Sequence, residues 1–246
     1  MNIKQSKEKS LPQKKWALAN MEVPEIIKNS AKVWAETLTG IVKSEPKDIL
    51  VSLGYIAQRL IADQHLNSVL VEWEKIREKG RMKEDYAQCM QAKYTLLELL
   101  KFLESDMPDE QRFQILKRIM LVAATEEKSD RQSIKPQEFM KLIKILPAGS
   151  VMVLTTAYQL SKNPPIGPGE NNRVNADSWV KIIAEKSGLE YPALVVMYEK
   201  PLIESMLLTE RVYADGSGVR LSPHFRVSDL GFELCSFLDH YDSLDL

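Results

Sequence analysis

The sequence predicts a mainly α fold: an N-terminal helical bundle followed by a C-terminal winged-helix-like domain with a small β-hairpin. Two observations lead to this prediction. Apolar residues recur at helical spacing through most of the chain, and proline or glycine interrupts that spacing at intervals. From about residue 173 to residue 241, the order becomes helix, turn, helix, glycine-rich hairpin and closing helix.

The composition is typical of a globular chain with one large or two modest domains. Of its 246 residues, 44% are hydrophobic and 27% are charged, which is enough apolar material for a core. The net charge of -1 excludes the broad electrostatic attraction of a nucleic-acid coat protein. Cys89 and Cys235 lie far apart in apolar helical patterns, so we expect two buried thiols rather than a disulfide.

Residues 1–20 are predicted to be a basic flexible tail. Five lysines face one acidic residue there, without aliphatic periodicity. An alternative interpretation is a polybasic anchor that makes this a peripheral membrane protein. The tail is followed by no apolar run of signal-peptide length, and no run in the chain approaches the roughly 20 residues that span a bilayer. We therefore expect a cytoplasmic protein.

Residues 21–162 are predicted to be a helical domain. Its predicted helices run from Ile27 to Val42, Asp48 to Glu78, Lys83 to Glu104, from the start signal Ser105 to Glu110 onward, Pro136 to Leu146, and Ser150 to Ser161. In the second helix, the predicted buried face consists of Leu66, Val69, Leu70, Trp73 and Ile76. The third carries leucines on more than one side (Leu96 to Leu103), so we expect it to be the central helix.

Residues 163–173 are predicted to be a linker, because Pro, Gly and Asn are concentrated there. The winged-helix-like domain, 174–246, follows. Asp177 is predicted to cap its first helix and Gly188 to end it. The second helix is expected from Pro192 to Glu210, with a kink or a division at Pro201.

The second helix of this domain occupies the position of a DNA-recognition helix but lacks its chemistry. Base recognition uses Arg, Lys, Asn or Gln in the major groove, whereas acids outnumber bases between Tyr191 and Arg211. We therefore predict protein contact, with Glu199, Lys200 and Glu204 as partner-binding candidates. The alternative is a DNA-binding winged-helix regulator that uses Lys181, Arg220 and Arg226.

No motif in the chain indicates catalysis. His65, His224 and His240 have no zinc-binding spacing, and the phosphate loop, the nucleophile elbow and the Cys-x-x-Cys pair are missing from the sequence. We predict no catalytic, cofactor or metal site. A site assembled from distant residues stays open as an alternative.

The stretch Ala123 to Leu160 resembles bacterial proteins of the phage abortive-infection alpha family. The positions that carry the resemblance are Ala123, Ala124, Pro136, Phe139, Leu146 and Leu154, together with Arg226-Val227-Ser228-Asp229-Leu230-Gly231. The resemblance implies a bacterial protein linked to defence against phage, and it supplies no catalytic residues. We therefore predict a non-enzymatic interaction or adaptor protein that binds a protein partner or a second copy of itself.

Overall fold

The computed structural model describes residues 49–83, 86, 89–105, 109–125, 134–163, 176–210, 213–214, 218–219 and 226–245. The predicted tail (1–20), the predicted helix from Ile27 to Val42 and nearly all of the predicted linker (163–173) lie outside these residues.

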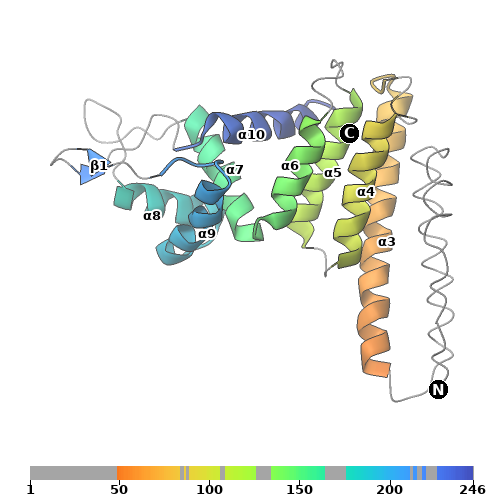
Figure 1. Cartoon of the computed structure of the whole chain (residues 1–246), viewed down its shortest axis with the longest axis horizontal. Helices are drawn as coiled ribbons and strands as arrows, with labels where there is room; N and C mark the ends of the chain where they lie inside the picture. The colour runs from red at the N-terminus through yellow and green to blue at the C-terminus, as the bar shows by residue number, and fades with distance from the viewer. Residues whose placement is uncertain are drawn as a thin grey trace, which may run out of the picture.

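The described residues form eight helices and one pair of two-residue strands, so the predicted mainly α fold is confirmed (Figure 1). The helices are α3 (Ile49–Glu78), α4 (Met90–Ser105), α5 (Glu110–Thr125), α6 (Lys135–Ile145), α7 (Ala148–Lys162), α8 (Ala176–Ser187), α9 (Pro192–Glu204) and α10 (Asp229–Asp242). The strands β1 (Tyr213–Ala214) and β2 (Gly218–Val219) pair antiparallel.

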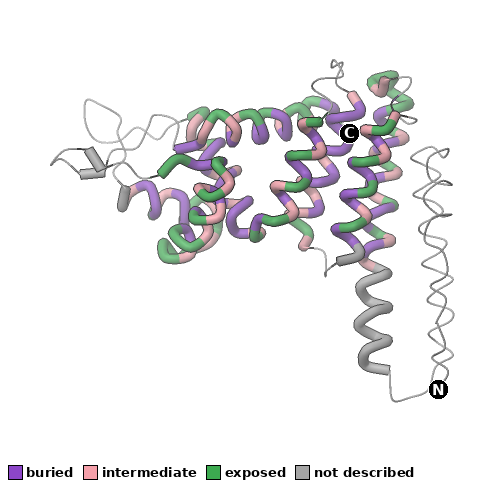
Figure 2. Tube along the Cα trace, viewed as in Figure 1, coloured by how far each residue is buried: buried purple, intermediate pink, exposed green. Residues whose placement is uncertain are grey.

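Helices α3 to α6 stand side by side, and α7, α8 and α9 pack on one another beyond α6 (Figure 1). Helix α10 runs across both groups and contacts α5 and α7. The buried side chains form one continuous apolar cluster through both groups. Figure 2 shows buried residues, in purple, along the helices of both groups. The division into domains 21–162 and 174–246 stays a prediction, and α10 contributes to the core of both.

The central helix is α5, not α4 as the sequence suggested. Helix α5 packs against α3, α4, α6, α7 and α10. From Ile119 to Ala124 every side chain is buried, which requires neighbours on all sides. Helix α4 instead leaves Tyr94 and Leu97 exposed. Each large aliphatic side chain removed from water contributes about 1.5–3 kcal/mol, so α5 supplies a large share of the stability.

Helix α4 begins at Met90, later than the predicted Lys83, because an aromatic contact holds the preceding segment. The ring of buried Tyr86 lies 5.8 Å from that of Trp73 on α3. The N–H of Lys83 donates to the carbonyl of Ala124 (3.1 Å), which ties the same segment to the end of α5. The thiol of Cys89 then accepts the N–H of Ala92 (3.4 Å), so Cys89 caps the helix.

Helix α10 packs chiefly on α5, whereas the sequence suggested that it closes a small C-terminal core. Ser228 caps it by accepting the N–H of Gly231 (3.0 Å). At Gly231 an added Cβ would lie 2.3 Å from the carbonyl oxygen of Leu207, so only glycine permits this approach. An isolated antiparallel bridge between Leu208 and Val227 brings the end of the α9 segment beside the start of α10.

The finer prediction of a winged helix is not established by these elements. Strands β1 and β2 hold two residues each, and no larger sheet is found among the described residues. Helix α10 leaves α8 and α9 to join the bundle.

Candidate interaction site

Helix α9 exposes apolar side chains, among them Val196 and Met197. Pro192 starts it, since proline at the first position needs no N–H and already has a helical φ. The residues that face inward are Val195, Glu199 and Leu202, at the i, i+4, i+7 spacing of one helix face. Pro201 lies within the helix, so the carbonyl of Met197 has no N–H four residues later to bind.

We define the α9 outer face as Ala193, Val196, Met197 and Lys200 together with the flanking residues Glu190 and Tyr191. Tyr191, Val196 and Met197 are 66%, 48% and 53% exposed, and Met206, beyond the helix end, is 74% exposed. Contiguous exposed apolar side chains with charged neighbours mark interaction surfaces, whereas isolated ones are ordinary. This face therefore has the character of a docking surface.

The outer face is held on a rigid support. The side chain of Ser150 in α7 donates a hydrogen bond to the carbonyl of Tyr198 (2.7 Å). Next to it, Gly149 lies so close to Tyr198 that an added Cβ would come within 2.3 Å of the ring. These contacts fix α9 against α7, which keeps the outer face in one place.

A buried ion pair fixes the inner side of α9. Nη1 of Arg226 donates to Oε1 of Glu199 (2.6 Å), and both side chains are almost sealed from solvent. The guanidinium also donates to the carbonyl of Thr209 (Nε 3.0 Å, Nη2 2.7 Å) and lies 4.8 Å from the ring centre of Trp179 in α8. One side chain thus joins α8, α9 and the base of the segment that contains β1 and β2.

Beside the α9 N-terminus is a shallow hollow of about 380 Å³. It lies at the junction of α8 and α9 and is lined by Lys181, Ala184, Glu185, Glu190 and Pro192. The sharp turn between the helices requires a left-handed backbone at Gly188 (φ +73°), as predicted, and at Glu190 (φ +59°). The hollow offers one lysine and two glutamates next to the α9 outer face.

The structure separates the predicted partner-binding residues. Lys200 and Glu204 are exposed and lie 3.9 Å apart as an i, i+4 pair. The expectation that Glu199 lies at the surface is wrong: it is 4% exposed because Arg226 draws it inward. Val196 and Met197, which were not among the predicted partner-binding residues, are exposed at the centre of the face instead.

The predicted nucleic-acid residues are also separated. Lys181 is exposed on α8. Arg226 is 1% exposed and paired with Glu199, so it cannot reach a phosphate in this fold, and its expected surface role is wrong. Arg220 lies outside the described residues. Of the three candidates, the structure places Lys181 alone at the surface.

No family model, no curated protein and no solved structure matches this chain. The resemblance to the abortive-infection alpha family stays a prediction.

The other polar clusters join helices to one another. Glu72 of α3 accepts from Lys117 of α5 (2.8 Å) and from the hydroxyl of Tyr241 in α10 (2.6 Å). Burial raises the pKa of Glu98 in α4, but hydrogen bonds from Lys144 (2.6 Å) and Lys101 (2.9 Å) outweigh it and hold that pKa below its usual value. Both oxygens of each carboxylate accept a hydrogen bond, and the bonds from Lys117, Tyr241 and Lys144 hold neighbouring helices together. The arrangement is typical of a structural role.

His65 is buried against the ring of Phe113, with ring centres 3.9 Å apart. Burial lowers its pKa, so the imidazole is neutral at pH 7.

Within the described part of the chain, no three His, Cys, Asp or Glu side chains gather as a metal site would require. Among the described helices, none is both long and apolar enough to cross a bilayer.

Proposed function

We propose that this chain is a protein-interaction module that docks a protein partner on the α9 outer face. The observation that carries the proposal is the exposure of Val196 and Met197 at the centre of a helix whose opposite side is fixed by Ser150 and Arg226. Rigid apolar side chains at the centre of a patch, with charges at its edge, are the usual anatomy of a protein interface.

The finer interpretation of the fold belongs to the same proposal. Two helices joined by a short turn and followed by two short paired strands support a winged-helix relationship in which α9 occupies the recognition-helix position. The centre of the outer face, Ala193, Val196 and Met197, offers no groups that bond to base edges, and Lys200 is the one basic side chain of the defined face, which favours protein over DNA. Defence against phage is the cellular context that the family resemblance implies.

Photocrosslinking in cells tests the proposal at single positions. A photoreactive amino acid at position 197 should give discrete cross-linked products, because the interface covers that side chain. The same amino acid at Val71, which is 52% exposed on α3, is the matched control and should give none of these products. Identical products from both positions, or none from position 197, would reject the α9 outer face as the docking surface.

A further inference from the structure

We infer that the partner of the α9 outer face is a second copy of this chain, with the two α9 helices antiparallel about a two-fold axis at the level of Val195. This inference rests on the proposed docking function and names the partner. Most soluble oligomers are symmetric dimers, in which the same surface of both copies must be complementary to itself. The α9 outer face meets that condition in side-chain size and in charge.

Size complementarity follows from the positions of one small and one large residue. In antiparallel helices related by a two-fold axis, the residue two positions before the axis level lies opposite the residue two positions after it. Ala193 and Met197 stand in this relation about Val195 and lie four positions apart on one side of the helix. The Met197 side chain of each copy therefore fits over the Ala193 of the other, with Val196 beside the axis.

Charge complementarity follows from the two ends of the strip. Glu190 lies in the turn just before the N-terminus of α9, Lys200 lies toward its C-terminus, and both are exposed. The symmetric pair therefore brings Glu190 of each copy toward Lys200 of the other, twice in the dimer. Glu190 lies at a hollow that is also lined by Glu185 and Lys181, so two carboxylates and one lysine face the incoming Lys200.

The described side chains of the wider surface have no net charge that would select an acidic or a basic partner. Among the side chains of α8, α9 and their connection whose burial is described, the exposed charged ones are three lysines and three glutamates: Lys181, Lys186, Lys200, Glu185, Glu190 and Glu204. Like-charge contacts reject wrong partners, so a balanced and alternating surface suits another copy of itself.

The test measures the mass of the purified full chain by sedimentation equilibrium across micromolar concentrations. Wild-type protein should be a dimer. Glu190→Lys and Lys200→Glu should each raise the dimer dissociation constant about tenfold, because each places like charges together at both ends of the interface. The combination of Glu190→Lys with Lys200→Glu restores opposite charges and should restore the wild-type constant.

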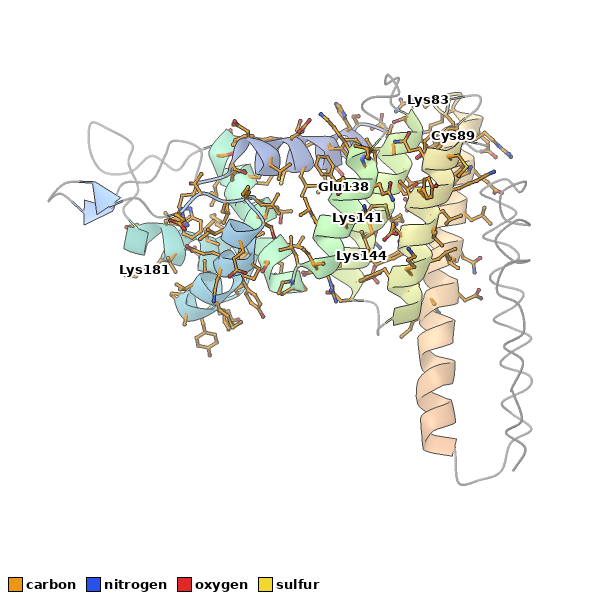
Figure 3. All side chains as sticks on the ribbon, viewed as in Figure 1. Lys83, Cys89, Glu138, Lys141, Lys144 and Lys181 are labelled. Carbon is orange, nitrogen blue, oxygen red and sulfur yellow. The ribbon has the colours of Figure 1, made fainter. Side chains whose placement is uncertain are left out.

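The matched control is the exchange of Glu138 and Lys141, an exposed pair on α6 that lies apart from Lys181 and α8 in Figure 3. Glu138→Lys and Lys141→Glu should leave the dimer constant unchanged. Circular dichroism should show that all variants stay folded, since the altered side chains are exposed.

A monomeric wild-type protein would overturn the second-copy inference, and so would single variants that dimerise like wild type. If the protein is monomeric but position 197 still cross-links to other proteins, the docking proposal holds and the partner is a different chain. Two results together would support self-pairing. Position 197 should give cross-linked products at twice the mass of one chain, and the combination of Glu190→Lys with Lys200→Glu should restore the wild-type dimer dissociation constant.

Discussion

Arg226 and Glu199 form an ion pair that is almost sealed from water, with 2.6 Å between Nη1 and Oε1. Arg226 itself sits in the left-handed region (φ +64°), which is strained for a long side chain. The carboxylate of Glu199 and the carbonyl of Thr209 together hold it there. The pair therefore joins α9 to the segment that follows it.

Removal of Glu199 should destabilise the fold strongly. Glu199→Ala leaves the Arg226 guanidinium buried without its carboxylate, and breaking a buried pair in this way costs about 3–5 kcal/mol. Glu204→Ala, at an exposed position of the same helix, should change the free energy of unfolding by no more than about 0.5 kcal/mol. Urea titration followed by circular dichroism compares the two; equal losses would contradict the structural role of the pair.

Tyr241 should contribute through one hydrogen bond to a charged group. Its hydroxyl donates a hydrogen bond to Glu72 (2.6 Å). The pKa of the phenol is raised, mainly by burial and secondly by this hydrogen bond to Glu72. Tyr241→Phe should lower the free energy of unfolding by about 1.5–3 kcal/mol. Tyr94→Phe, on the exposed side of α4, is the control. Urea titration of both variants should show little change in the free energy of unfolding for Tyr94→Phe.

His65 should make the fold sensitive to acid. Burial lowers its folded-state pKa below 6.5, and Lys117 lowers it further while Glu110 opposes them. The unfolded chain then binds the proton more readily, so the stability decreases as the pH falls from neutral through 6.5 toward the folded-state pKa.

His65→Phe keeps the stacking on Phe113 and removes the titration. Unfolding free energies at about pH 7.5 and about pH 5.5 should differ less in this variant than in wild type, and the difference between the two proteins isolates His65 from the carboxylates. An unchanged pH dependence would show that His65 takes up a proton in the folded protein as easily as in the unfolded chain.

The two cysteines are free thiols and should react at different rates. Burial, with the nearby charge of Asp239, raises the pKa of Cys235 to about 12, whereas Cys89 is half-exposed. Brief alkylation of the native protein at about pH 8 should label Cys89 and spare Cys235, as read by mass spectrometry of peptides. In urea both should be labelled, and native labelling of Cys235 would show that α10 opens readily.

The helices whose ends carry proline or glycine were predictable from the sequence. Helix α6 begins beside Pro136 and ends before Pro147, and α8 ends at Gly188, as predicted. These residues act locally through their own φ angles or missing N–H, so no knowledge of distant contacts is needed.

Contacts between distant segments were not predictable in the same way. The charge of Glu199 suggested exposure, because the helical period could not reveal the buried partner that Arg226 supplies. Similarly, the apolar side of α10 was evident, but not that α5 would cover it. A periodic pattern shows which side of a helix avoids water and leaves its neighbour undetermined.

The packing of α10 on α5 has a consequence during synthesis. Helix α5 ends at Thr125 and α10 begins at Asp229, 104 positions later in the sequence (229 minus 125), so the ribosome makes α5 well before α10. Until α10 has been made, it cannot cover the side of α5 on which it packs in the folded protein. The bundle therefore reaches its final form only late in translation, and a chaperone that shields α5 should increase the yield of native protein.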